Sequence, residues 1–222
     1  MPRKLNLIPG YRQAVNFVAS RWFLIPYFSA SQRQGIIEAE ANDPVRYGTI
    51  ALALEQVAKL EIPGALAECG VYRGYLSRFV HQALPKRKYY LFDTFAGFDE
   101  RDSDTKSDER FKDTSLEGVK SYIGGNKNLV FRQGFFPETA KGLEKDKFAF
   151  VVLDFDKYEP TVEALKFFYP RLSQGGYLFV HDYNSPESNW ACSRALNEFL
   201  ADKPEQSIAI PDAWGSALFR KI

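Results

Sequence analysis

The stretch ALAECGVYRGYLSRF, residues 65–79, decides how this chain is interpreted. Its apolar first part, residues 65–69, predicts a buried strand, and residues 74–84 have the amphipathic spacing of a helix that ends before a proline. Gly70 and Gly74 enclose the short loop between the two elements. Such a loop occurs in cofactor sites and also as an ordinary turn from strand to helix. The rest of the sequence has to show which of these two interpretations is right.

The composition is typical of a globular protein with one sizeable core. The chain has 222 residues, of which 45% are hydrophobic and 26% are charged, and this length suits a single domain. The formal net charge is +1, so no overall attraction to nucleic acid or to an anionic membrane is expected. The 19 Phe and 12 Tyr residues predict a core or a pocket that is rich in aromatic side chains.

Cysteine and histidine are too few for a zinc cluster. Cys69 and Cys192 are the two cysteines, neither has a CxxC partner, and the chain contains two histidines. We therefore expect reduced thiols in a cytoplasmic protein. The first ten residues contain no apolar run of the length that a signal peptide needs, which favours the same location.

Residues 1–60 are predicted to form a mostly helical cap or lid. Within them, residues 47–61 have apolar side chains at helical spacing. Residues 14–28, AVNFVASRWFLIPYF, are apolar but too short to span a bilayer, and they contain Arg21 and Pro26. We expect no transmembrane segment here. A lid or a dimer face is favoured over a membrane-surface helix, which leaves a homo-oligomer open.

After residue 61, short apolar runs alternate with amphipathic runs. Besides the first strand, strands are predicted at residues 89–92, 129–132, 148–154, 177–182 (after a Gly175-Gly176 turn), 207–211 and 214–220, and helices at residues 158–172 and 189–201. Alternating strands and helices predict a parallel sheet, but the last two strands lie too close in sequence for a crossover helix and must be antiparallel. The predicted fold class is α/β: a Rossmann-like, mostly parallel seven-stranded sheet with an antiparallel C-terminal hairpin and helices on both faces. This layout resembles that of class I methyltransferases, with residues 61–222 as the core.

Polar and charged residues follow five of these strands at one sheet edge, where open α/β sheets bind their ligands. The candidate site residues at these strand ends are Glu68, Gly70, Val71, Tyr72, Arg73, Gly74, Asp93, Thr94, Phe95, Gly134, Phe135, Asp154, His181 and Asp182. Because five separate strand ends agree, we interpret the loop after the first strand as part of a cofactor site.

The spacing of this loop indicates which kind of cofactor it suits. Gly70 and Gly74 form a GxxxG pattern with the bulky Tyr72 and Arg73 inside, unlike the GxGxxG pattern of pyrophosphate-binding loops. Asp93, at the end of the second strand, is placed to accept hydrogen bonds from ribose hydroxyls. Together these features favour a nucleoside-bearing cofactor without a pyrophosphate.

Asp154 and Asp182 end neighbouring strands, and His181 lies next to Asp182. Such a group could hold a divalent cation or orient and deprotonate a hydroxyl. Asp156 is expected to cap the helix that follows it. The charged residues 99–113 are predicted to form a solvated loop, with a lid over the pocket as the alternative.

Five pieces of the chain, in this order and spacing, resemble the macrocin O-methyltransferase family from about residue 40 to the end. They are AECGVYRG, LFDTFAGF, FRQGFFPETA, LDFDKYEPTVEALKFFYPRLSQGGYLFVHDY and WGSALFRK. The resemblance implies an enzyme that methylates sugar hydroxyls of natural-product glycosides with S-adenosylmethionine. The acceptor would be a sugar or glycoside.

The resemblance also implies roles for particular residues. Glu68, Gly70 and Gly74 would surround the methionine part of the cofactor, and Asp93 would bind its ribose. Asp154, His181 and Asp182 would form a magnesium site beside the acceptor hydroxyl, with Asp154 as the general base.

The chain departs from the family at this metal site, because His181-Asp182 replaces two acidic residues. An imidazole favours Mn²⁺ over Mg²⁺. Alternatively, the metal is lost and His181 is itself the catalytic base.

Two other classes of function stay open at this point. A nicotinamide-dependent oxidoreductase is disfavoured by the GxxxG loop and by the antiparallel hairpin. A non-catalytic protein that keeps the fold, with its aromatic N-terminal segment as an interface, is favoured only by the histidine at position 181. The O-methyltransferase is the expected function.

Overall fold

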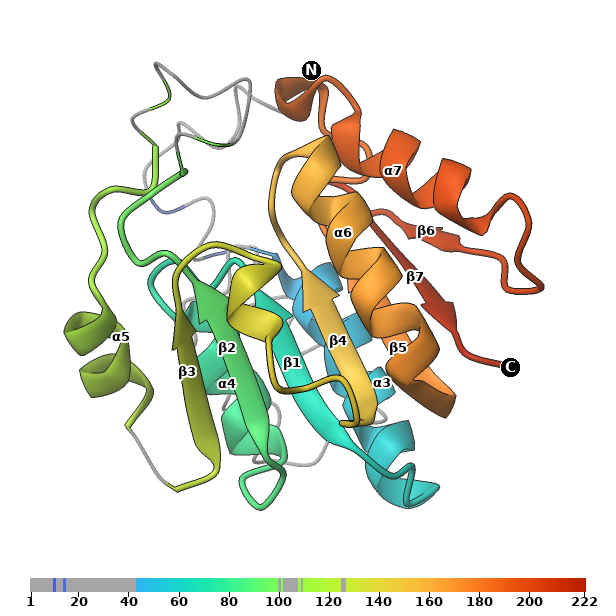
Figure 1. The fold of residues 1–222 in the computed structure, drawn as a ribbon, viewed down its shortest axis with the longest axis horizontal. Helices are drawn as coiled ribbons and strands as arrows, with labels where there is room; N and C mark the ends of the chain where they lie inside the picture. The colour runs from blue at the N-terminus through green and yellow to red at the C-terminus, as the bar shows by residue number, and fades with distance from the viewer. Residues whose placement is uncertain are drawn as a thin grey trace.

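The structure, a computed structural model, describes Gly10, Ala14 and residues 43–99, 101, 108, 110–124 and 127–222. A seven-stranded sheet lies at the centre of this part of the chain (Figure 1), with the strand order β3-β2-β1-β4-β5-β7-β6. The strands are β1 Ala65–Cys69, β2 Tyr89–Asp93, β3 Leu129–Gln133, β4 Phe148–Leu153, β5 Leu172–Val180, β6 Ile208–Ile210 and β7 Ser216–Arg220.

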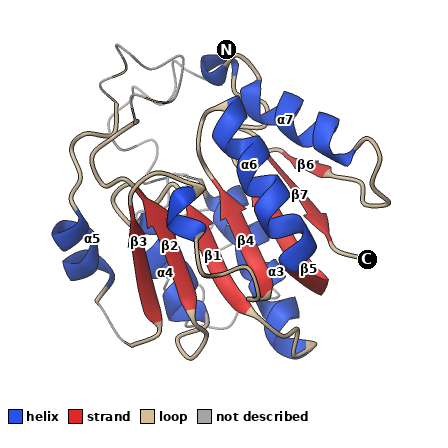
Figure 2. Ribbon diagram, in the orientation of Figure 1, coloured by secondary structure: helices blue, strands red, loops and turns tan. Residues whose placement is uncertain are grey.

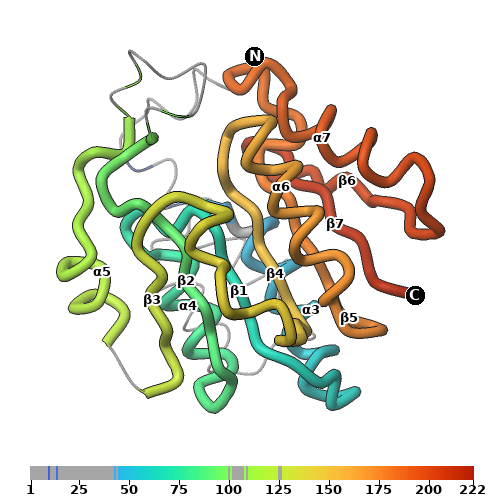
Figure 3. The backbone as a smooth tube through the Cα atoms, in the orientation of Figure 1, coloured from blue at the N-terminus to red at the C-terminus, as the bar shows by residue number. Residues whose placement is uncertain are grey.

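The first five strands are mutually parallel, and β7 runs antiparallel to both β5 and β6 (Figure 2). Figure 3 traces the last part of the chain from the final helix through β6 and back along β7 to the C-terminus. The predicted fold class, a mostly parallel seven-stranded sheet closed by an antiparallel hairpin, is therefore confirmed.

Helices cover both faces of the sheet, as Figure 1 shows. They are α3 Pro44–Lys59, α4 Tyr75–Ala83, α5 Leu116–Ile123, α6 Tyr158–Phe168 and α7 Ala191–Leu200, with short 3₁₀ turns η2 Glu138–Ala140, η3 Tyr169–Arg171 and η4 Pro186–Ser188. Helices α3, α4 and α5 share one hydrophobic core with the sheet, and α6 and α7 share another. Strand β1 serves both cores, since Leu66 joins the first while Ala67 and Cys69 join the second.

The chain reverses its direction of travel across the sheet at β1, whose neighbours are β2 on one side and β4 on the other. Connections leave β1 and β4 toward opposite ends of the sheet, which opens a crevice at their carboxyl ends. This crevice is where the predicted site residues should gather.

The sequence misplaced the start of β5. The predicted helix over residues 158–172 ends at Phe168, and the Gly175-Gly176 pair lies inside β5 rather than in a turn before it. The pair forms an irregularity in the pairing with β4. A β-carbon on Gly176 would lie 2.8 Å from the Ser173 carbonyl oxygen and 2.9 Å from that of Ala149, so only glycine fits there.

The predicted helical cap is described only in part. Helix α3 covers most of the expected residues 47–61, and the Asp43 side chain caps it by accepting a hydrogen bond from the Arg46 backbone N–H at 3.1 Å. The apolar segment 14–28 lies outside the described residues apart from Ala14, so its role as a lid or dimer face stays a prediction. None of the helices in the described part of the chain combines the length and apolarity that crossing a membrane requires.

Candidate functional site

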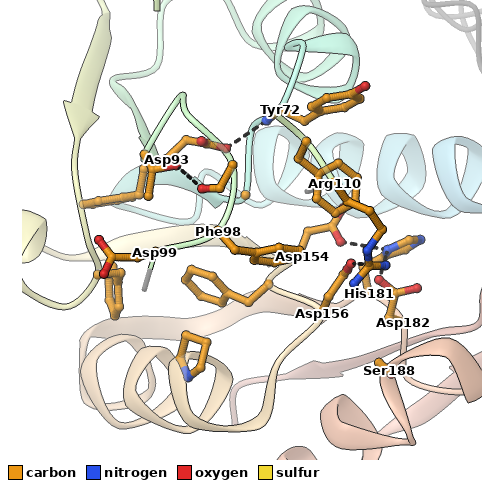
Figure 4. A pocket seen from close by; sticks show the side chains of 18 of the residues that line it. Tyr72, Asp93, Phe98, Asp99, Arg110, Asp154, Asp156, His181, Asp182 and Ser188 are labelled. Atoms are coloured by element: carbon orange, nitrogen blue, oxygen red, sulfur yellow. Dashed lines mark hydrogen bonds and ion pairs between the residues drawn. The ribbon is translucent and has the colours of Figure 1, made fainter. Parts of the chain in front are cut away.

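A pocket of about 400 Å³ opens at the carboxyl ends of the parallel strands (Figure 4), within the size range of small-molecule sites. Its walls combine the loops after β1, β2, β3, β4 and β5 with side chains from α3, from the charged loop and from the β6–β7 connection. Figure 4 shows two groups of acidic side chains in it. Asp93 and Asp99 lie on one side, and Asp154, Asp156 and Asp182 lie on the other.

Gly70 brings the loop after β1 into direct contact with the end of β4. Its φ is +84°, and a β-carbon would lie 1.9 Å from the Asp154 carbonyl oxygen. No other residue type fits this approach. The glycine therefore places the backbone of the loop beside Asp154 and against the pocket.

The Asp93 side chain stabilises the conformation of this loop through hydrogen bonds. Its Oδ2 accepts hydrogen bonds from the backbone N–H groups of Val71 at 2.6 Å and Tyr72 at 2.9 Å, and its Oδ1 accepts one from Phe95 at 2.6 Å. Burial raises the pKa of Asp93 although these three bonds oppose the shift. A carboxylate can accept about four hydrogen bonds, so capacity for a ligand hydroxyl is left.

A second set of contacts ties the loop to the segment before α5. The Tyr72 hydroxyl donates to Asp113 at 2.7 Å, and the Thr114 hydroxyl donates to the Tyr72 carbonyl oxygen at 2.5 Å. Arg73 forms an ion pair with Asp113. Tyr72 lines the pocket, whereas its neighbour Arg73, which is paired with Asp113, does not.

Glu68 lies beneath the loop and does not line the pocket. Its carboxyl group is buried and accepts a hydrogen bond from the Tyr89 hydroxyl. Burial raises the pKa of Glu68 to about 8, so the group is mostly a neutral acid at pH 7. Gly74 also lies behind the pocket wall, where a β-carbon would come within 3.0–3.2 Å of Val119 and Ile123 on α5.

On the opposite side of the pocket, His181 lies between two carboxylates. Its Nδ1 is 2.8 Å from Asp154 Oδ1 and 3.2 Å from Asp182 Oδ2 (Figure 4). Burial alone would lower the pKa of His181, but the Asp154 carboxylate and the hydrogen bonds to both partners raise it to about 10. Burial would likewise raise the pKa of Asp182, but the hydrogen bond from His181 brings it to about 2.

Arg46, on the first turn of α3, reaches the same group. Its Nη1 lies 3.7 Å from Asp154 Oδ2. Asp43 fixes the start of α3, because its Oδ1 accepts from Arg46 N–H and its Oδ2 accepts from Ala213 N–H at 2.5 Å. That second bond fastens the helix to the β6–β7 connection, from which Trp214 lines the pocket.

Asp156 was predicted to cap α6, and this prediction is wrong. Lys157 occupies the N-cap position without a side-chain cap bond, whereas Asp156 has a φ of +60° and lines the pocket. There its carboxyl group meets Asp182 and lies 3.4 Å from Arg110 Nη1. Burial, together with Asp182, holds the pKa of Asp156 well above its usual range.

The described part of the charged loop faces the pocket rather than only solvent. Arg110 pairs with Asp108 at 2.7 Å, and its guanidinium lies 5.3 Å from the ring centre of Phe98 and 5.4 Å from that of Phe111. Asp99, Arg110 and Phe111 line the pocket. Residues 100, 102–107 and 109 lie outside the described residues, so the lid itself stays a prediction.

The structure brings most of the predicted site residues to one pocket. Those that line it are Gly70, Tyr72, Asp93, Thr94, Gly134, Phe135, Asp154, His181 and Asp182, while Glu68, Val71, Arg73, Gly74 and Phe95 do not line it. Sequence reasoning missed Arg46, Asp156 and Trp214, and it assigned no role to Arg110. Of these, only Asp156 carried a usable signal, because it follows a buried strand two residues after Asp154.

The donor atoms near Asp154 can be tested against the magnesium ion that the fold family implies. Asp154, His181 and Asp182 offer ligand atoms within 4.8 Å of one another. However, Mg²⁺ prefers oxygen ligands, and a ligating histidine normally donates its second ring N–H to a partner. His181 Nε2 is buried and has no such partner among the described residues. With the Arg46 guanidinium beside Asp154 as well, the group does not fit a magnesium site.

Comparison with known proteins finds a family of methyltransferases that this chain resembles. It matches the family described as macrocin-O-methyltransferase (TylF) over residues 45–221. It is 29% identical over 172 residues to the 8-demethyl-8-(2,3-dimethoxy-alpha-L-rhamnosyl)-tetracenomycin-C 4'-O-methyltransferase of Streptomyces olivaceus, which covers 69% of this chain and 64% of that protein. It is 27% identical over 174 residues to the mycinamicin III 3''-O-methyltransferase of Micromonospora griseorubida, which covers 69% of this chain and 67% of that protein.

A solved structure agrees with this placement. The O-methyltransferase NovP matches with a TM-score of 0.68 and 26% sequence identity, over 79% of each chain. The chain spans about two thirds of the length of the two curated relatives it matches. The family match covers most of the chain and confirms the resemblance seen in the sequence. This protein belongs to the macrocin-O-methyltransferase family.

Proposed function

We propose that this protein is an S-adenosylmethionine-dependent O-methyltransferase that acts on a hydroxyl of a sugar or of a glycosylated small molecule. Family membership supports this reaction. The observation that carries the assignment is that one pocket joins the Gly70–Asp93 region to the carboxylate group around Asp154. A cofactor and an acceptor can therefore meet in one pocket.

The loop side of the pocket fits S-adenosylmethionine. Gly70 holds the loop backbone against Asp154 at the pocket, where the methionine part would bind, and Asp93 keeps hydrogen-bonding capacity for a ribose hydroxyl. We assign Tyr72, Thr94, Gly134 and Phe135 to the same subsite. The residues that do not line the pocket, Glu68, Val71, Arg73, Gly74 and Phe95, would act by shaping the loop.

When bound, S-adenosylmethionine supplies a methyl group on a positively charged sulfur. The chain's own part is to hold an acceptor hydroxyl in line with that methyl group. As the acceptor oxygen forms its bond to the methyl carbon, the carbon–sulfur electron pair leaves with sulfur and the hydroxyl proton passes to Asp154. His181 is less suited to be the base, because its Nδ1 donates to the two carboxylates and its other ring nitrogen, Nε2, is buried.

A methyl-transfer assay tests this function. Purified protein is incubated with S-adenosylmethionine carrying a radiolabelled methyl group and with a panel of deoxysugar glycosides and free sugars. We expect label in a glycoside product, and a loss of about 100-fold or more in rate for Asp154→Asn. No labelled product from any sugar or glycoside, with the folded protein binding cofactor, would contradict the acceptor class. An NADH titration without binding would remove the oxidoreductase alternative.

A further inference from the structure

The corner of the pocket around Asp154 contains positively charged and hydrogen-donating protein groups where the family is expected to hold a metal ion. Asp154 and Asp182 provide the carboxylates, and His181 and Arg46 approach them. Both donors belong to fixed parts of the fold. His181 follows β5 and is 7% exposed, and the Arg46 side chain is 19% exposed.

His181 links the two carboxylates through one ring nitrogen. Its Nδ1 lies within hydrogen-bonding distance of an oxygen from each, and two ionised carboxylates can only accept. The ring therefore has to present an N–H between them. A metal ion bound through the same nitrogen would need that N–H to be lost and both hydrogen bonds to be broken.

Arg46 lies beside Oδ2, the second carboxylate oxygen of Asp154. The guanidinium lies 3.7 Å from Oδ2, and its charge is permanent. The backbone that carries it is held in place, because Asp43 binds both the Arg46 N–H and the Ala213 N–H. A divalent cation at Asp154 would lie next to this positive charge, which lowers the affinity of the site for it.

We propose that Arg46 and His181 take the place of the divalent cation, so that this protein performs its methyl transfer without a metal ion. The inference rests on the function proposed above and adds a positioning role for both residues. They hold the Asp154 carboxylate toward the acceptor hydroxyl and balance the charges of Asp154 and Asp182.

Manganese binding provides the test, since Mn²⁺ tolerates imidazole ligands and free Mn²⁺ is detected directly by electron paramagnetic resonance. The full chain is titrated with Mn²⁺ as wild type, His181→Asp, His181→Asn and Arg46→Met. We expect no binding to the wild type at submillimolar Mn²⁺. We expect His181→Asp to bind more than ~100-fold more tightly than the wild type. His181→Asn is the matched control, because it removes the ring without adding a charge and should not gain binding.

Activity gives the second readout. Turnover of the wild type should be unchanged by EDTA, whereas any turnover of His181→Asp should depend on added Mn²⁺. Tight binding of Mn²⁺ to the wild type, or a loss of wild-type activity in EDTA, would overturn the inference. The wild-type measurements decide the matter even if a variant fails to fold. Binding of S-adenosylhomocysteine is measured in the same samples. A wild-type protein that does not bind S-adenosylhomocysteine would contradict the proposed function. A wild-type protein that binds both S-adenosylhomocysteine and Mn²⁺ tightly would contradict only this inference.

Discussion

Gly70 lets the loop after β1 pack directly against Asp154 in the candidate site. Adding a β-carbon there would place it 1.9 Å from the Asp154 carbonyl oxygen, in a backbone conformation with φ of +84°. Gly142 has nearly the same φ, +88°, but a β-carbon there would meet nothing within 4 Å. The two glycines therefore separate the cost of the left-handed conformation from the cost of the steric clash.

We predict that Gly142→Ala lowers the free energy of unfolding by about 1–2 kcal/mol, the cost of the left-handed conformation alone. Gly70→Ala should lose roughly 3 kcal/mol beyond that, because it forces the β1 loop away from β4. It should also lose measurable affinity for S-adenosylhomocysteine. Urea denaturation and calorimetric titration check the two effects. Equal losses of stability in both variants would show that the contact with Asp154 is not rigid.

Glu68 provides a pH-dependent test at the same scale. Its pKa is raised from 4.5 to about 8 in the folded protein, because the carboxyl group is buried. The unfolded chain therefore releases this proton at lower pH than the folded chain does. Stability contributed by Glu68 must fall as the pH rises from about 4.5 to about 8 and stay level above that range.

Glu68→Gln removes this titration and keeps a hydrogen-bond acceptor for Tyr89. We predict that the variant gains stability relative to the wild type between pH 5 and pH 8, by a total on the order of 4 kcal/mol. Denaturation curves of both proteins at intervals of pH measure this difference. A difference that does not change with pH would mean that Glu68 ionises in the folded protein as it does in the unfolded chain.

At the scale of helices and strands, the start of α3 connects stability to the site. Asp43 caps this helix and also binds the Ala213 backbone, so it sets where Arg46 stands beside Asp154. Asp43→Ala should reduce the free energy of unfolding by about 1–2 kcal/mol, as the loss of a helix cap does. It should also reduce kcat about tenfold, since Arg46 loses its support.

Ser173→Ala is the matched control for this prediction. It removes the hydrogen bond from the buried Ser173 hydroxyl to the Pro63 carbonyl oxygen, 2.7 Å long, near the start of β5. It should lose about 1 kcal/mol of stability and leave kcat unchanged. If both variants lose stability and neither loses turnover, Arg46 does not position the reacting groups.

The elements that the sequence predicted best are those whose pattern is local. The buried apolar runs of β1 and β4 and the amphipathic α4 were placed within one or two residues. The irregular start of β5 could not be predicted, because Gly176 is required there by the carbonyl oxygens of Ser173 in β5 and Ala149 in β4. Helix α5 was missed since it is short and buries only Val119 and Ile123.

For the whole molecule, the alternation of strands and helices predicted the sheet, and the strand order then determines where the pocket opens. That is why Asp93, Asp154 and His181 could be assigned to one site from their positions at strand ends. Arg46 and Trp214 could not, because they enter the pocket from segments at the two ends of the chain. The hydrogen bond from the Ala213 N–H to Asp43 joins these two segments.

We expect this pocket to bind the methyl donor at its Asp93 side and to carry out the transfer at its Asp154 side. The most direct measurement is calorimetric titration of S-adenosylhomocysteine into the wild type, Asp93→Asn and Asp154→Asn. We expect micromolar binding to the wild type, binding within about threefold of it for Asp154→Asn, and a loss of about tenfold or more for Asp93→Asn. A folded wild-type protein that binds no S-adenosylhomocysteine at millimolar concentration would show that this pocket does not hold the methyl donor.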